Sequence, residues 1–188
     1  AWASLGNWAK HATGVVDLCG IPTYGIDFHN ASALPDALAA VPPNTQLLLC
    51  HQSWAEIQRV GQTDGAFSMI PHGLTLLTGD FHVCKTYEGK AANGEPVITH
   101  SPGSTAMQAV NEPPDKYIGI LFDDLSVQWV RIPTRGFISC VINTEDELAS
   151  LVAKMQAGSL RPELDGYHPA NVWRPILRVR YDDTIPEA

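Results

Sequence analysis

Imidazole and carboxylate side chains follow two apolar segments of this sequence. His51 comes directly after the segment 46–50, and Asp80 and His82 follow the segment 74–78 after a glycine. Both donor types bind divalent metal ions. Alternate residues of an extended loop can aim two donor atoms at neighbouring metal positions, which suits Asp80 and His82. A lone histidine at a strand end is more often structural, so it is the combination that predicts a metal site.

A third apolar segment, 96–100, ends in Ser101, Pro102, Gly103 and Ser104. The backbone N–H groups and hydroxyls of such a loop could contact a substrate, although turn chemistry explains a Pro-Gly pair equally well. We expect Ser101, Gly103 and Ser104 to bind substrate if this loop lies beside the other two.

The three apolar segments are typical of strands that are covered on both faces. Open α/β sheets bind their ligands in the loops where the strands end. The sequence therefore predicts an α/β fold, a layered sheet flanked by helices, that brings the three loops to one edge.

Further periodic segments complete the predicted architecture. A helix capped by Ser32 is expected up to residue 40, and a helix capped by Thr144 is expected up to about 157. A boundary near Pro133 or Thr134 would separate the main domain, 1–133, from a small α+β appendage, 134–188. The other predicted elements are a helix at 2–12 and strands at 15–19, 23–28, 117–122, 126–132, 136–142 and 176–181.

The composition excludes several classes of protein. A formal net charge of −8 argues against a surface built for nonspecific attraction of a polyanion, so any contact with nucleic acid must be local. Four widely spaced cysteines suit reduced thiols better than a disulfide framework. No apolar run reaches the ~20 residues that span a bilayer. We expect a soluble, cytoplasmic protein.

The order of these segments resembles the last conserved blocks of calcineurin-like metallophosphoesterases of the SbcD-type DNA repair nuclease family. The blocks are His51, the Gly-Asp-Phe-His segment 79–82 and the Ser-Pro-Gly-Ser segment 101–104. The segment 128–137 is similar to the one that joins the phosphoesterase core of that family to its capping domain. The segment 175–181 is similar to a strand of the capping domain.

The resemblance, which spans most of 24–181, implies a two-metal site. His51 and Asp80 would bind one Mn²⁺, and His82 the other. Most relatives carry His where this chain carries Asp80, and a carboxylate is an acceptable hard ligand for Mn²⁺. Two metals about 4 Å apart activate a water and neutralise phosphate oxygens during attack on a phosphodiester. The resemblance further implies DNA as substrate and an SbcC-type ATPase as partner.

Two arginines alternate along the last predicted strand. Arg178 and Arg180 share one face of it and could touch DNA phosphate. At this net charge, a solvated strand face is the simpler interpretation.

The first conserved blocks of the family are an Asp-x-His, a Gly-Asp and a Gly-Asn-His-Asp. We expect no counterpart of these blocks in the sequence before His51. The segment 6–8 is superficially similar to the last of these, but Trp8 replaces the histidine and the pattern around Asn7 is helical. We therefore expect the carboxyl-terminal part of a nuclease subunit, inactive in isolation and completed by amino-terminal sequence or by a separate chain. A homodimer is left open.

Three alternatives remain at this stage. A softer zinc site could form from Cys50, His51, His82 and Cys84. The chain could belong to a metallophosphoesterase that acts on a nucleotide or a phosphoprotein, although the segments after 128 argue against it. It could also be a noncatalytic remnant of the fold that serves as an interaction subunit.

Overall fold

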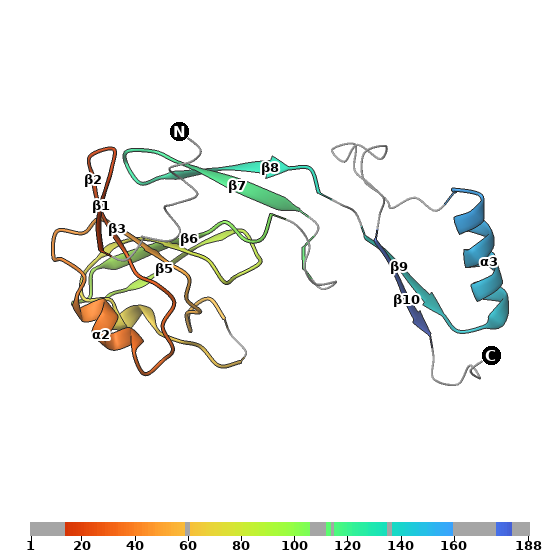
Figure 1. Cartoon of the computed structure of the whole chain (residues 1–188), viewed down its shortest axis with the longest axis horizontal. Coiled ribbons are helices and arrows are strands. Elements are labelled where there is room, and N and C mark those ends of the chain that lie inside the picture. Colours follow the sequence, from red (N-terminus) through yellow and green to blue (C-terminus); the bar gives the residue numbers. More distant parts are fainter. Residues whose placement is uncertain are drawn as a thin grey trace. The chain divides into compact units, whose positions relative to one another are not determined.

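The computed structural model describes residues 14–58, 61–105, 112–113, 115–134, 137–159 and 176–181. The chain forms two compact units. The first contains Ala1–Ser104 and Tyr117–Val130, and the second contains Thr105–Lys116 and Arg131–Ala188 (Figure 1). The helix expected at 2–12, which includes Asn7, lies outside the described residues.

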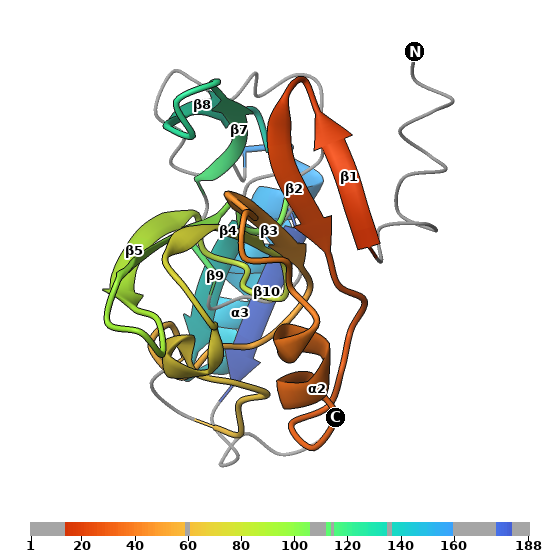
Figure 2. The same ribbon diagram turned by 90° about the vertical axis from the view of Figure 1, so that its left-hand side faces the viewer.

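The first unit is built on a six-stranded sheet in the order β1-β2-β3-β4-β6-β5. The strands β2, β3, β4 and β6 run parallel to one another, and β1 and β5 are antiparallel strands at the two edges (Figure 2). A mixed α/β fold is thereby confirmed. The bounds are β1 (Gly14–Leu18), β2 (Ile21–Gly25), β3 (Leu47–Cys50), β4 (Leu74–Thr78), β5 (Lys85–Lys90) and β6 (Pro96–Ser101).

The parallel register places the ends of the inner strands together. Cys50 pairs with Thr78 at the ends of β3 and β4, and Leu77 pairs with His100 near the ends of β4 and β6. Since parallel strands share a direction, the loops after β3, β4 and β6 leave from the same edge of the sheet. This carboxyl edge is where the sequence places His51, Asp80 and the segment 101–104.

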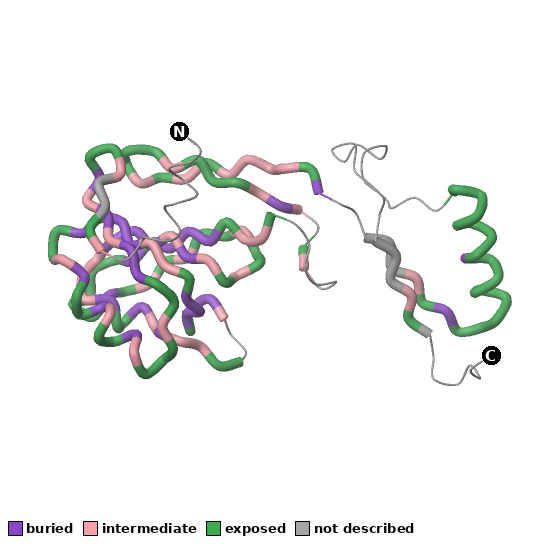
Figure 3. The backbone as a smooth tube through the Cα atoms, in the orientation of Figure 1, coloured by how far each residue is buried: buried purple, intermediate pink, exposed green. Residues whose placement is uncertain are grey.

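One face of the sheet packs against a buried apolar cluster. Leu48, Leu76 and Val97 point from the inner strands into this cluster, where they meet the short helix α2 (Leu34–Ala39) and the 3₁₀ turn η1 (Phe67–Met69). Trp54 and Phe67 fill its centre, with ring centroids 5.7 Å apart. The buried positions accordingly follow the strands of the first unit (Figure 3).

The other face is covered in part by the strands β7 (Lys116–Leu121) and β8 (Val127–Ile132), which a turn at Asp123 and Asp124 connects as expected. The indole of Trp129 meets the imidazole of His100 edge-on, with ring centroids 6.2 Å apart. A sheet covered on both faces explains why the segments that form β3 and β4 are continuously apolar.

Two local expectations need correction. Ser32 does not cap α2. The N-cap residue of this helix is Ala33, and it makes no side-chain capping hydrogen bond. Instead Asn30 Oδ1 accepts hydrogen bonds from the backbone N–H of Ala33 and from Ser32 Oγ, at 3.1 and 2.7 Å. The strand expected at 23–28 ends earlier, at Gly25, so the residues after it belong to a loop.

The second unit contains helix α3 (Glu145–Gln156) and two parallel strands, β9 (Phe137–Ile142) and β10 (Ile176–Tyr181). Thr144 caps α3 as expected, because its Oγ1 accepts from the N–H of Glu147 at 3.2 Å. The Glu147 carboxylate accepts in turn from the N–H of Asn143 at 2.6 Å. Within the described ranges, no helix is long and apolar enough to cross a membrane.

Candidate functional site at the carboxyl edge of the sheet

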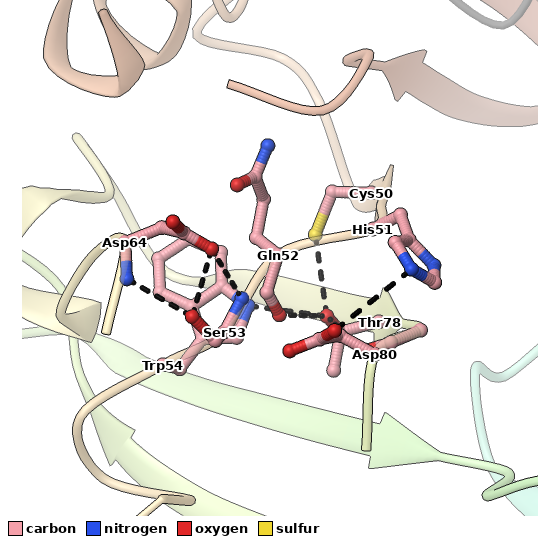
Figure 4. Close-up of polar contacts among 9 residues, drawn as sticks. Cys50, His51, Gln52, Ser53, Trp54, Asp64, Thr78 and Asp80 are labelled. Atoms are coloured by element: carbon pink, nitrogen blue, oxygen red, sulfur yellow. Dashed lines mark hydrogen bonds and ion pairs between the residues drawn. The ribbon is translucent and has the colours of Figure 1, made fainter. Parts of the chain in front are cut away.

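His51 and Asp80 meet at the carboxyl edge of the sheet. His51 is the first residue after β3, and Asp80 is the second after β4. The distance from His51 Nε2 to Asp80 Oδ1 is 4.0 Å, and the two side chains are 67% and 43% exposed (Figure 4). An accessible imidazole and an accessible carboxylate therefore face each other at the place where the sequence predicts a metal ligand pair.

Gly79 makes this approach possible. A β-carbon at position 79 would stand 2.2 Å from His51 Nδ1, far inside any permitted contact. The imidazole can lie over the end of β4 only because this residue has no side chain.

Asp80 has an unusual backbone conformation. Its φ angle is +76°, in the left-handed region that costs most side chains about 1–2 kcal/mol but that aspartate tolerates better than most. Backbone strain of this kind is concentrated at functional sites. Here it accompanies the turn that places the Asp80 carboxylate beside His51.

Behind the pair, the Thr78 hydroxyl is the centre of a buried polar cluster. It accepts hydrogen bonds from Trp54 Nε1 at 3.2 Å and from Cys50 Sγ at 3.5 Å, and it lies 3.0 Å from the carbonyl oxygen of Gln52 (Figure 4). Desolvation by burial raises the pKa of the Cys50 thiol to about 12. Although Cys50 as a residue is partly exposed, its sulfur therefore stays protonated and acts as a donor toward Thr78.

The loop that carries His82 packs against the loop after β6. The N–H of Ser104 donates to the carbonyl oxygen of His82 at 3.4 Å. Gly103, at φ +73°, lies so close that a β-carbon there would stand 2.8 Å from the Cys84 nitrogen and 2.9 Å from the His82 oxygen. The structure thus brings Gly103 and Ser104 to the His82 loop by backbone contacts.

Ser101 occupies a different position. It is completely buried, and its hydroxyl has no hydrogen-bond partner among the described residues. Its side chain faces the interior of the unit, whereas the exposed part of this loop begins at Pro102.

The described residues contain no group of three or more His, Cys, Asp and Glu side chains that could hold a metal ion. The structure accordingly brings His51 and Asp80 together as a pair, and His82 stands on the same edge without completing a cluster. The same finding argues against the zinc site of Cys50, His51, His82 and Cys84. Its two thiols also have raised pKa values through desolvation, which disfavours the thiolate form that binds zinc.

Arg178 and Arg180 lie on β10, in the second unit. They alternate along the strand, so their α-carbons share one face. Arg180 is exposed, and the side chain of Arg178 is outside the described set.

Sequence reasoning missed a further feature of the carboxyl edge. Asp27 and His29 form an Asp-x-His tripeptide in the loop that follows β2, the neighbour of β3. The amide of Gln52 donates to the carbonyl oxygen of Asp27 at 3.0 Å and so ties this loop to the segment after His51. The expectation that no Asp-x-His precedes His51 is therefore corrected: the tripeptide stands in the sequence, but the expected strand extended through Phe28 and placed its first two residues inside the sheet.

Two other histidines lie within hydrogen-bond distance of groups inside the first unit. His100 Nδ1 lies 2.9 Å from Thr86 Oγ1, and desolvation by burial lowers the pKa of the His100 imidazole. His72 Nε2 lies 3.1 Å from the carbonyl oxygen of Thr45.

A small apolar cavity lies at the carboxyl edge of the sheet, on the face covered by β7. Its volume is about 290 Å³, and it is lined by Leu49, Leu77, Thr78, Gly79, Pro102, Gly119 and Leu121. The Thr78 hydroxyl points to the opposite face, toward Trp54, so no side-chain hydrogen-bonding group serves this cavity.

A comparison of the chain with models of known protein families found no match, and a comparison with curated proteins found none either.

Proposed function

We propose that this chain supplies the His51, Asp80 and His82 loops of a Mn²⁺-dependent DNA nuclease subunit of the SbcD type. The observation that carries the proposal is the 4.0 Å approach of an exposed imidazole and an exposed carboxylate at the carboxyl edge of parallel strands. The order of the motifs along the sequence is the basis for proposing this family and for proposing DNA as the substrate.

The pair has the chemistry of a hard divalent metal site. Two ligands that each lie about 2.1 Å from one ion are separated by about 3 Å when adjacent and about 4.2 Å when opposite. The 4.0 Å between Nε2 and Oδ1 is close to the separation of opposite ligands. His51 and Asp80 would hold one ion, and His82, two residues after Asp80, would contribute to a second.

When bound, two such ions supply an activated water and neutralise charge on a phosphodiester. The part of this chain is to fix the ligand loops. Thr78 bonds to the segment around His51, Gly79 leaves room for its imidazole, and Gly103 and Ser104 contact the loop of His82. The remaining ligands, among them a bridging carboxylate, would come from the amino-terminal blocks of the family, on preceding sequence or on a separate chain.

The proposal includes the wider setting that the resemblance implies. The substrate is DNA, an SbcC-type ATPase is the partner, and the compartment is the cytoplasm. Because the net charge is −8, contact with DNA would be confined to local features such as the exposed Arg180.

A noncatalytic role is the second candidate. It is favoured by the finding that the described residues form no group of three metal donors. An interaction subunit would keep the sheet and its loops without binding a metal ion.

Metal binding separates the two candidates. Mn²⁺ is titrated into the 188-residue chain, and free ion is followed by electron paramagnetic resonance. The nuclease proposal expects a saturable site that is lost in both His51→Ala and Asp80→Ala, while His72→Ala, a histidine bonded to Thr45 away from this edge, keeps it. Absence of saturable binding both in the chain alone and in its mixture with a polypeptide that carries the remaining ligands would favour the noncatalytic role.

A further inference from the structure

One buried hydroxyl group connects the two strand ends that carry the candidate metal ligands. Thr78 is the last residue of β4 and stands two residues before Asp80. Its hydroxyl contacts come from the segment 50–54, which surrounds His51 in the sequence. The group thus joins the segment of one ligand to the segment of the other.

The hydrogen-bonding capacity of this hydroxyl is fully used. It has one hydrogen to donate and two lone pairs to accept. Trp54 Nε1 and Cys50 Sγ donate to it, and it donates toward the carbonyl oxygen of Gln52 at 3.0 Å, with the oxygen of Gly79 at 3.2 Å as a second acceptor. Each bond needs a particular orientation, so the set leaves the Thr78 side chain a single rotamer.

Burial makes the arrangement hard to replace. Thr78 is 1% exposed and Trp54 is completely buried, so water cannot take over their bonds without a rearrangement. Loss of the hydroxyl would leave the indole N–H unpaired and would free the Gln52 carbonyl. Both changes act on backbone that leads directly to His51.

We propose that Thr78 is the positioning residue that sets the separation of His51 and Asp80. Its contacts on either side of His51 hold the end of β3 at a fixed distance from the start of the Asp80 turn. The inference rests on the proposed metal site and adds a determinant of its geometry. Supporting residues of this kind orient metal ligands, and their loss commonly lowers metal affinity by about 10–100-fold.

A matched control exists in the same sheet. Thr99 lies on β6, pairs in register with Leu76 of β4 and is completely buried like Thr78. Its hydroxyl has no hydrogen-bond partner among the described residues. Thr99→Val therefore removes a buried hydroxyl of the same kind without removing a link to His51.

The experiment compares Mn²⁺ binding by the full chain with that of Thr78→Val, Thr78→Ser and Thr99→Val. We expect about 10-fold or greater loss of affinity in Thr78→Val, and affinity within about 3-fold of the parent in Thr78→Ser and Thr99→Val. Circular dichroism establishes that each variant is folded. If Thr78→Val is destabilised but binds Mn²⁺ like the parent, Thr78 is a core residue only and the inference is overturned.

Two further measurements keep the outcome decisive. If Thr78→Val does not fold, Trp54→Phe removes one donor to the hydroxyl, and unchanged Mn²⁺ affinity in that folded variant overturns the inference. If the parent chain binds no Mn²⁺, the His51–Asp80 pair does not hold the ion by itself, which bears on the proposed function and leaves the role of Thr78 to be decided separately. In that case NMR shifts of the His51 ring and the Asp80 amide in the metal-free chain decide the point, because the inference requires both to change in Thr78→Val and neither in Thr99→Val.

Discussion

The imidazole of His51 lies against the α-carbon of Gly79, at a distance that leaves no room for a side chain on residue 79. A β-carbon there would meet Nδ1 at 2.2 Å and Cε1 at 3.0 Å. A side chain introduced at position 79 would therefore first contact the imidazole of His51, a candidate metal ligand. The His51 side chain is 67% exposed, so it can rotate away into solvent.

Gly79→Ala should therefore separate metal binding from stability. We expect the ring to leave Asp80 and Mn²⁺ affinity to fall about 10-fold or more, while the free energy of unfolding changes by less than about 1 kcal/mol. Affinity is measured by Mn²⁺ titration and stability by urea denaturation. In a His51→Ala background, Gly79→Ala should lower affinity no further, and an additional loss there would contradict this account.

Gly103→Ala should have the opposite signature. The new β-carbon would meet backbone atoms of the His82 loop at 2.8–3.0 Å, and backbone cannot rotate away as a side chain does. Added to the cost of φ +73°, this predicts a loss of about 2–4 kcal/mol in the free energy of unfolding. Gly94→Ala is the matched control, because Gly94 has φ +85° and open space around it. Equal losses in the two variants would show that the contact with the His82 loop contributes nothing.

Asp80 combines a proposed ligand role with backbone strain, and substitutions can separate the two. Asp80→Asn keeps a residue type that tolerates φ +76°, so stability should stay within about 0.5 kcal/mol while Mn²⁺ affinity is lost. Asp80→Ala should lose the same affinity and be less stable than Asp80→Gly by about 1–2 kcal/mol. Urea denaturation of the three variants checks the order. Equal stability of the Ala and Gly variants would show that the turn relaxes.

Cys50 should make the protein sensitive to alkali. Its thiol has a pKa of about 12 in the folded chain against an ordinary value of 9.0, because burial disfavours the thiolate. A group whose pKa is raised by folding contributes stability that is present below the unfolded value and lost as pH rises toward the folded value. Between pH 8 and pH 10 the free energy of unfolding should fall by on the order of 1 kcal/mol through this group.

Cys50→Ser isolates the contribution, since serine keeps a donor for Thr78 but does not titrate in this range. The variant should lose less stability than the parent between the two pH values in urea denaturation. Cys19→Ser, at an exposed cysteine, should behave like the parent. Parallel pH profiles for Cys50→Ser and the parent would refute the assignment.

The inner part of the sheet could be predicted from the sequence, because its strands are formed by continuous apolar segments. The segment 74–78 is uninterrupted apolar or threonine sequence followed by Gly-Asp, and β4 occupies those residues. Parallel strands covered on both faces leave this signal, and their common direction brings the following loops to one edge. The pairing of His51 with the Asp80 loop follows from that rule alone.

The features that escaped prediction depend on partners far away in the sequence. The strand β5 is largely exposed and mostly polar, and it is defined by its pairing with β6 rather than by an apolar pattern. The contacts of Thr78 reach across 24–28 residues, to Trp54 and Cys50, and Gly79 is required by a histidine on another strand. No local pattern encodes such contacts, so the supporting residues of the site became visible only in three dimensions.

The last prediction concerns catalysis by the chain with and without the missing ligands. Alone, the chain should show no Mn²⁺-dependent cleavage of linear duplex DNA, because in-line attack needs two ions and the described residues present no three-donor group.

Cleavage should appear when the chain is mixed with, or joined to, a polypeptide that carries the Asp-x-His, Gly-Asp and Gly-Asn-His-Asp blocks of an SbcD-type nuclease. The edge strand β1 offers a surface for that association, since its backbone on one side has no partner among the described residues and Val15 is 78% exposed. His82→Ala and Asp80→Ala should each abolish cleavage and leave association intact, as gel filtration of the mixture would show, whereas Arg180→Ala should weaken DNA binding only modestly. Robust cleavage by the 188-residue chain alone would show that its own residues complete the site, and stable association without cleavage would favour the noncatalytic role.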